Sequence, residues 1–259
     1  MGEYARAGGL RTYYEVQGAG DPVVLLHGGG VGAESWACQT PALAERYRVY
    51  VPERRGHGHT PDVEGAFTTE AMAGDTIAFL ESLHIGPARL VGWSDGALVG
   101  VRVALRRPDL VRKLVLIGQY LTRDGATAAA KAFIETPAVS LAEIFGPSYA
   151  LTSPDGPDHL PVFLDKLSAM WRGEPDIELA ALGDLAMPVL VLQGDDDAVR
   201  IEHSLAVARA LPDAQLAVVP CASHALPVER PALLNQILMD FLADEQPAKF
   251  MPLGALADG

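Results

Sequence analysis

The chain has 259 residues, 49% of them hydrophobic and 20% charged, which suits one domain with a large core. Its formal net charge of −13 argues against nucleic acid or an anionic membrane as a partner, because both bind concentrated basic surfaces. The two cysteines are too few for a disulfide framework, and no Cys/His cluster has zinc-site spacing, so no metal is expected.

The N-terminal residues, MGEYAR, contain no apolar stretch of the kind found in secretory signals. The longest apolar runs have the length of a strand and are broken by Gly, Pro or charged residues, so none is expected to span a membrane. We therefore expect a cytoplasmic protein whose partner is a small-molecule substrate.

The first predicted elements in chain order are two β-prone stretches, 3–7 and 10–16, which flank Gly8-Gly9 and predict a hairpin. After them, continuous apolar runs alternate with amphipathic stretches. The apolar runs predict strands at 23–26, 49–51, 90–91, 114–117, 189–192 and 216–219. The amphipathic stretches predict helices at 69–83, 96–106, 201–211 and 231–242. Fully apolar strands are typical of a parallel sheet covered by helices on both faces, so the predicted fold class is α/β.

The connection at 118–188 is too long for a single crossover helix. Helical patterns at 126–135, 141–145 and 160–171 predict a helical cap over one end of the sheet, whose aromatic residues either pack on the main domain or wall a pocket. The predicted organisation is a core of 1–118 and 189–243, a cap of 119–188 and a tail of 244–259. The tail is expected to be mobile or to form a contact between copies of the chain in a homo-oligomer.

The strongest chemical signal is Gly92-Trp93-Ser94-Asp95-Gly96, between a predicted strand and a predicted helix. A serine on a sharp strand-to-helix turn needs small residues two positions before and after it, because the strained backbone leaves no space for side chains. The turn also directs the helix N-terminus at the site, where aligned amides favour developing negative charge. Ser94 is therefore the predicted nucleophile.

A second signal is the glycine-rich loop His27-Gly28-Gly29-Gly30, which directly follows the first long strand. Backbone of this kind can approach a substrate carbonyl closely, so the Gly29 amide is the predicted oxyanion donor, together with the amide of Asp95. Gly30 is the alternative donor and a predicted substrate contact. His27 is interpreted as a brace for this loop.

Two further signals follow the last two strands. Three consecutive aspartates at 195–197 end one strand, and any of them can hold an imidazole in the required tautomer. His224 lies in the loop after the last strand and is the predicted general base. The order Ser, Asp, His along the chain is the order found in hydrolases.

Together these motifs resemble the α/β-hydrolase superfamily, from the hairpin to about Leu242. The resemblance also includes Arg55-Gly56-His57-Gly58, and it selects Asp197 as the acid because the family's acid follows a glycine by three positions. It implies an eight-stranded, mostly parallel sheet, a cap between strands six and seven, and no cofactor. One departure is Cys221, where the family usually has a small glycine.

The predicted reaction is cleavage of a small ester, lactone or related carbonyl compound through an acyl-enzyme on a Ser94-His224-Asp197 triad. The predicted substrate contacts are Gly30, Trp93, Asp95, Tyr120 and Trp171. Asp95 has two possible roles. Its carboxylate binds a substrate ammonium, as in the valacyclovirase-like hydrolases that share Gly-Trp-Ser-Asp-Gly, or the residue contributes only its backbone amide. A carbon–carbon bond hydrolase, a cofactor-free perhydrolase and a ligand receptor on the same scaffold stay open. Arg54 and Arg55 are expected to pair with surface acids.

Overall fold

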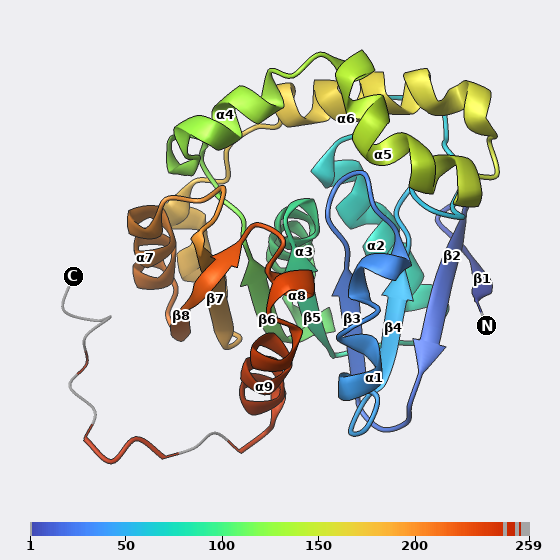
Figure 1. Ribbon diagram of the computed structural model, residues 1–259. Helices are drawn as coiled ribbons and strands as arrows, with labels where there is room; N and C mark the ends of the chain where they lie inside the picture. The colour runs from blue at the N-terminus through green and yellow to red at the C-terminus, as the bar shows by residue number, and fades with distance from the viewer. Residues whose placement is uncertain (1, 246–247, 252–253, 255–259) are drawn as a thin grey trace.

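The computed structural model describes residues 2–245, 248–251 and 254, and it contains one eight-stranded sheet with the order β1-β2-β4-β3-β5-β6-β7-β8 (Figure 1). The strands are β1 (Glu3–Ala7), β2 (Leu10–Gln17), β3 (Pro22–Leu26), β4 (Arg48–Pro52), β5 (Ala88–Trp93), β6 (Val111–Ile117), β7 (Val189–Asp196) and β8 (Ala214–Ser223). The β1–β2 hairpin and the β2–β4 pair are antiparallel, and the remaining pairs are parallel. The predicted α/β fold is confirmed.

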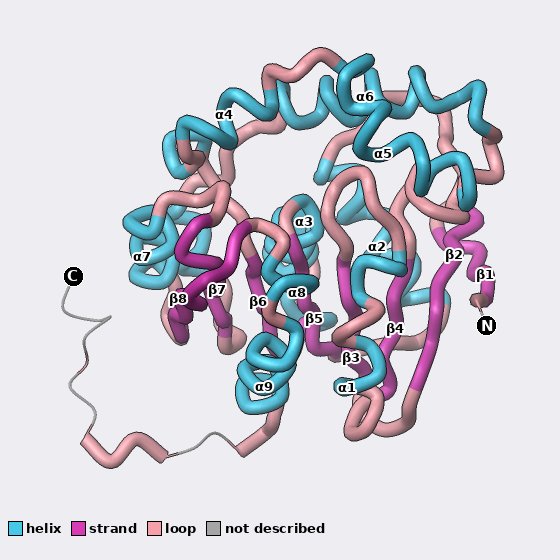
Figure 2. The backbone as a smooth tube through the Cα atoms, in the orientation of Figure 1, coloured by secondary structure: helices cyan, strands magenta, loops and turns pink. Residues whose placement is uncertain are grey.

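The helices flank the sheet and connect its strands (Figures 1 and 2). They are α1 (Thr40–Leu43), α2 (Thr69–Ser82), α3 (Asp95–Arg106), α4 (Ala128–Ile134), α5 (Ala138–Thr152), α6 (Leu160–Gly173), α7 (Ile201–Ala210), α8 (Leu226–Glu229) and α9 (Pro231–Leu242). Short 3₁₀ segments occur at Ala33–Trp36, Pro108–Leu110, Arg123–Gly125, Pro157–His159 and Leu179–Asp184.

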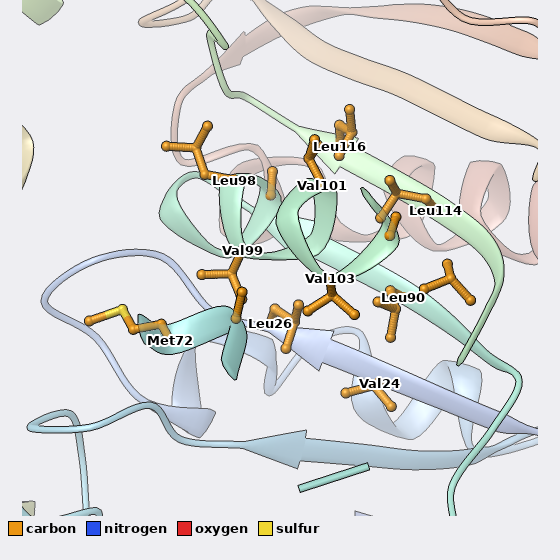
Figure 3. Packing of buried hydrophobic residues seen from close by; sticks show 14 of the residues in the cluster. Val24, Leu26, Met72, Leu90, Leu98, Val99, Val101, Val103, Leu114 and Leu116 are labelled. Carbon is orange, nitrogen blue, oxygen red and sulfur yellow. The ribbon is translucent and has the colours of Figure 1, made fainter. Parts of the chain in front are cut away.

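The core consists of two apolar layers, one on each face of the sheet. Along β3, Val24 and Leu26 pack in the layer that contains α2 and α3, whereas Val23 and Leu25 pack in the layer that contains α1 and α9. Figure 3 shows the first layer, in which apolar side chains of α3 lie over those of β3, β5 and β6. Because side chains alternate along a strand, a strand with apolar residues at every position buries both faces.

Helices α4, α5 and α6 lie together above one end of the sheet, between β6 and β7 in sequence (Figures 1 and 2). Helix α5 is longer than the predicted 141–145. It begins at Ala138 and continues through Gly146 and Pro147. A Cβ at Gly146 would lie 3.2 Å from Leu160 Cδ2, so the glycine allows a close approach between α5 and α6. This packing outweighs the local preference of Gly-Pro to end a helix.

The sequence division into core, cap and tail stays a prediction. Asp244 begins the predicted tail, and its carboxylate pairs with the buried Arg89 at 2.6 Å. Residues 246–247, 252–253 and 255–259 of that tail lie outside the described residues. Within the described part of the chain, no helix combines the length and apolar character needed to cross a bilayer.

Candidate active site

The turn between β5 and α3 presents Ser94 at the end of the sheet where the parallel strands finish. Ser94 has φ 55° and ψ −126°, a left-handed conformation that is costly for a residue with a side chain. A Cβ at Gly92 would overlap the backbone of Gly96 and Ala97, and a Cβ at Gly96 would overlap the Leu26 and His27 carbonyl oxygens. The glycines on both sides of the serine are therefore required by close backbone packing.

Ser94, His224 and Asp197 form a continuous chain of hydrogen bonds. His224 Nε2 lies 3.0 Å from Ser94 Oγ, and His224 Nδ1 lies 2.8 Å from Asp197 Oδ1. Because the carboxylate is an acceptor, Nδ1 donates to it and Nε2 is left to accept from the serine hydroxyl. The three predicted side chains thus meet at the ends of β5, β7 and β8.

Asp197 is the aspartate of the three at 195–197 that reaches the imidazole. Its side chain is fully buried and accepts hydrogen bonds from the Gly194 and Ala198 amides. Asp195 instead accepts from the Ala222 amide at 3.1 Å, and Asp196 is exposed. The geometry therefore separates three residues that are chemically equivalent in the sequence.

Trp93 lies beside the imidazole. Its indole N–H donates to the His224 carbonyl oxygen at 2.9 Å, and its ring packs edge-on against the fully buried Trp36. Trp93 is not among the residues that line the cavity under the cap. Trp93 therefore supports the His224 loop, and its contact with substrate stays a prediction.

The glycine-rich loop is held from below by His27 and Arg54, both buried. His27 Nε2 accepts from the Arg54 backbone N–H at 3.0 Å, and burial, together with the Arg54 charge, holds the pKa of His27 well below its usual range. His27 is therefore neutral and supports the loop, in line with its interpretation as a brace. The prediction that Arg54 pairs with a surface acid is wrong, whereas Arg55 does pair with Asp75, at 2.6 Å.

Between the cap and the sheet lies a hollow of about 480 Å³, its open mouth included. Its lining residues are Thr69, Asp95, Leu98, Gln119, Tyr120, Leu121, Arg123, Ile134, Met170, Trp171, Glu174, Pro175 and Asp176. Three predicted substrate contacts, Asp95, Tyr120 and Trp171, are among them. Ser94 itself is not, so the hollow adjoins Ser94 through its neighbour Asp95.

Asp95 connects the turn at Ser94 to helix α6. Its side chain is buried, and Asp95 Oδ2 accepts from Trp171 Nε1 of α6 at 2.8 Å. Burial raises the pKa of the Asp95 carboxyl, and the positive charge of Arg54 and the indole N–H oppose that rise. Burial and the nearby Asp95 also raise the pKa of Tyr120 to about 12, so its hydroxyl stays protonated at neutral pH.

Charged groups around the hollow are mostly acidic. Among the described residues that line it, Asp95, Glu174 and Asp176 are acidic and Arg123 is the one cation. The Arg123 guanidinium donates to the Arg172 carbonyl oxygen at 2.8 Å and to Glu135 at 3.1 Å. Glu174 is partly balanced by Arg102 at 2.8 Å. Across the described ranges 2–245, 248–251 and 254, no group of three or more His, Cys, Asp or Glu is placed to hold a metal ion.

Residues 23–237 match the model of the alpha/beta hydrolase family. The chain is an enzyme of this family. A 2-hydroxy-6-oxo-2,4-heptadienoate hydrolase of Pseudomonas putida is 28% identical over 268 residues, covering 95% of this chain and 97% of the relative. RutD of Azorhizobium caulinodans, provisionally named a carbamate hydrolase, is 26% identical over 260 residues, covering 93% and 98%. The solved structure of a bromoperoxidase from Bacillus anthracis is 27% identical with a TM-score of 0.77, covering 94% and 100%.

In this α/β-hydrolase, two neighbours of the site were missed by the sequence reasoning. Phe145 of α5 lies against the loop, because a Cβ at Gly30 would overlap its ring. Gly118, directly after β6, has φ 61°, and a Cβ there would lie 3.0 Å from Asp197 Oδ2 and 3.2 Å from His224 Nδ1. A glycine immediately after an apolar run was a visible signal for the second, whereas nothing local marked Phe145.

Replacing Gly118 with alanine in this hydrolase is expected to lower kcat by about 10- to 100-fold, because the added methyl group presses on the Asp197–His224 hydrogen bond at a positive φ. Steady-state kinetics and a melting curve check this. Gly173→Ala is the matched control, because no atom lies within 4 Å of its added Cβ. A folded Gly118→Ala enzyme with unchanged kcat would contradict the expectation.

Proposed function

We propose that this α/β-hydrolase cleaves a small, uncharged ester, lactone or carbamate through an acyl-enzyme on Ser94. The observation that carries the proposal is the hydrogen-bonded chain from Ser94 through His224 to Asp197. In this mechanism His224 Nε2 takes the hydroxyl proton while Oγ attacks the carbonyl carbon. The imidazolium then gives that proton to the leaving group, and Asp197 stabilises its charge. Water repeats the two steps and releases the acid.

The amides of Gly29 and Asp95 are the proposed oxyanion donors. Asp95 is the first residue of α3, so its N–H belongs to the free N-terminus of that helix. Gly28 approaches the nucleophile closely, because a Cβ built on it would lie 3.4 Å from Ser94 Cβ. The loop therefore runs beside the reacting hydroxyl, where an amide can meet the developing charge.

The acidic lining of the hollow supports an uncharged substrate. The name of the Pseudomonas putida relative specifies a dienoate, which is a carboxylate, whereas the esters, lactones and carbamate esters proposed here carry no charge. A substrate carboxylate in this hollow would meet three acids and an arginine that already has partners. At about 6 Å and an effective dielectric constant of about 20, one like-charge contact costs about 3 kcal/mol, or roughly 100-fold in kcat/KM.

This proposal is tested with three p-nitrophenyl esters of similar length: an uncharged butyrate, a carboxylate-bearing succinate and an amino-bearing 4-aminobutyrate. The butyrate is expected to exceed the succinate by about 100-fold in kcat/KM. Asp95→Asn is expected to reduce that preference to below about tenfold, and Asp165→Asn, on the exposed side of α6, is the control. The preference should also weaken as the pH falls, because Asp95 loses its charge on passing below its raised pKa.

The outcomes distinguish the alternatives. Equal rates on butyrate and succinate at every pH would overturn the neutral-substrate proposal and favour the carbon–carbon bond hydrolase. A 4-aminobutyrate ester whose kcat/KM falls more than that of the butyrate in Asp95→Asn would show that this carboxylate binds an ammonium group. Acceleration by peroxide in place of water would indicate a perhydrolase. A single burst of product without turnover would indicate a ligand receptor.

A further inference from the structure

Arg54 is a buried cation that no described carboxylate neutralises by direct contact. It follows β4, and only 3% of the residue is exposed. Across residues 2–245, 248–251 and 254, no Asp or Glu lies within ion-pair distance of its guanidinium. Burial lowers the pKa of Arg54 to about 10, which still leaves it charged at neutral pH. A buried charge that makes no direct ion pair is costly, even with the Asp95 carboxyl in its vicinity, so its position calls for an explanation.

One guanidinium nitrogen, Nη2, contacts the glycine-rich loop, whereas Nη1 donates to Met72 Sδ at 3.7 Å. Arg54 Nη2 donates to the His27 carbonyl oxygen and to the Gly28 carbonyl oxygen, each at 2.7 Å. The neutral His27 ring adds to the same contact, because its Nδ1 lies 2.8 Å from the Gly28 carbonyl oxygen and its Nε2 accepts from the Arg54 amide. Arg54 and His27 together therefore hold two successive peptide units of the loop.

The orientation of one peptide unit links these contacts to the reaction. The Gly28 carbonyl and the Gly29 N–H belong to the same trans peptide, so they point in opposite directions. Because the carbonyl points at the buried guanidinium, the Gly29 N–H points away from Arg54. Gly29 lies against Asp95 and Trp171, the two residues that meet above the nucleophile turn. The Gly29 N–H is therefore directed away from the buried guanidinium, in a loop that borders Ser94 and Asp95.

We infer that Arg54 is a positioning residue for the oxyanion hole, and that it sets the Gly29 amide by holding the Gly28 carbonyl from inside the core. This inference rests on the proposed acyl transfer at Ser94. The loop is built of glycines, which have little conformational preference of their own, so an external clamp is needed to keep one orientation. The guanidinium provides that clamp and places a positive charge one peptide unit from the developing oxyanion.

The experiment compares Arg54→Met with Arg55→Met, its neighbour in sequence, which pairs with Asp75 away from the loop. Two inhibitors of the same shape are used: a trifluoromethyl ketone, which forms an anionic adduct with the nucleophile, and its alcohol, which does not. Arg54→Met is expected to lose about 100- to 1000-fold in kcat with KM within about threefold. Its Ki for the ketone should rise by a similar factor, while its Ki for the alcohol changes by less than about threefold. Arg55→Met should leave kcat and the Ki values for both inhibitors unchanged.

If Arg54 had only a structural role, Arg54→Met would raise the Ki values for both inhibitors by the same factor, or it would lower stability. In either case the ratio of the alcohol Ki to the ketone Ki would stay as in the wild type. A folded Arg54→Met enzyme with a wild-type ratio overturns the inference. If Arg54→Met does not fold, the same pair is measured on Arg54→Gln, which is polar but shorter and uncharged, and a wild-type ratio there overturns the inference equally. Arg54→Lys should recover part of the loss. A wild-type enzyme that shows no preference for the ketone would instead remove the proposed acyl transfer itself.

Discussion

Ser94→Ala is expected to lower kcat by about four to six orders of magnitude. The variant keeps the backbone of the turn but removes the oxygen that lies 3.0 Å from His224 Nε2. Without that oxygen no acyl-enzyme forms, and the oxyanion donors act only on direct attack by water. Steady-state hydrolysis of a p-nitrophenyl ester and labelling by a fluorophosphonate both measure the loss.

The control for this change is Cys221→Ser, because Cys221 is an exposed thiol near His224 in sequence and a thiol is also able to act as a nucleophile. Its activity and labelling should match those of the wild type. Near wild-type esterase activity in Ser94→Ala would end the assignment of Ser94 as nucleophile. Loss of labelling in Cys221→Ser instead would transfer that role to the thiol.

Asp197→Asn is expected to lower kcat by about 10⁴-fold. The asparagine side chain fits the same space, but its amide hydrogens favour an imidazole with the proton on Nε2, which cannot accept from the serine hydroxyl. The Asp197 side chain is fully buried, so bulk solvent does not reach it to restore the tautomer. The measurement is kcat for the same ester across the pH range, with the melting temperature recorded for each variant.

Asp196→Asn is the matched control, since it makes the same chemical change at the adjacent, exposed position. Its kcat is expected to stay within about twofold of the wild type, as for most surface substitutions. A large loss in Asp196→Asn together with an active Asp197→Asn would show that the acid had been misassigned. The comparison thus tests which of the aspartates at 195–197 orients His224, a choice that the sequence alone leaves open.

The predictions for Ser94→Ala and Asp197→Asn depend on contacts between residues that are far apart in the chain. The sequence could predict these contacts only in part. The strand–Gly92-to-Gly96–helix pattern indicated Ser94, because the strain of that turn is a local property. The choice of Asp197 relied on family resemblance, and the geometry supports it through the 2.8 Å contact with His224. Local chemistry alone does not distinguish Asp197 from its neighbours.

The cap was harder to predict than the core. Continuous apolar runs such as 189–192 indicate buried strands because both faces of the sheet are covered. In α5, local rules predicted an end before Gly146-Pro147, yet the helix continues because it packs closely on α6. Tertiary contacts of this kind have no periodic signal in the sequence, since they depend on the shape of another element.

By itself the sequence determined the α/β class, the order of the elements and the turn that carries Ser94, because hydrophobic periodicity and glycine spacing act over a few residues. Only the tertiary structure decided which aspartate meets the imidazole and why Arg54 is buried. The Arg54 guanidinium reaches carbonyls 26 and 27 residues earlier in the chain. Whether a cation lies on the surface or under the glycine-rich loop depends on how β3 and β4 pair, and that pairing exists only in the folded chain.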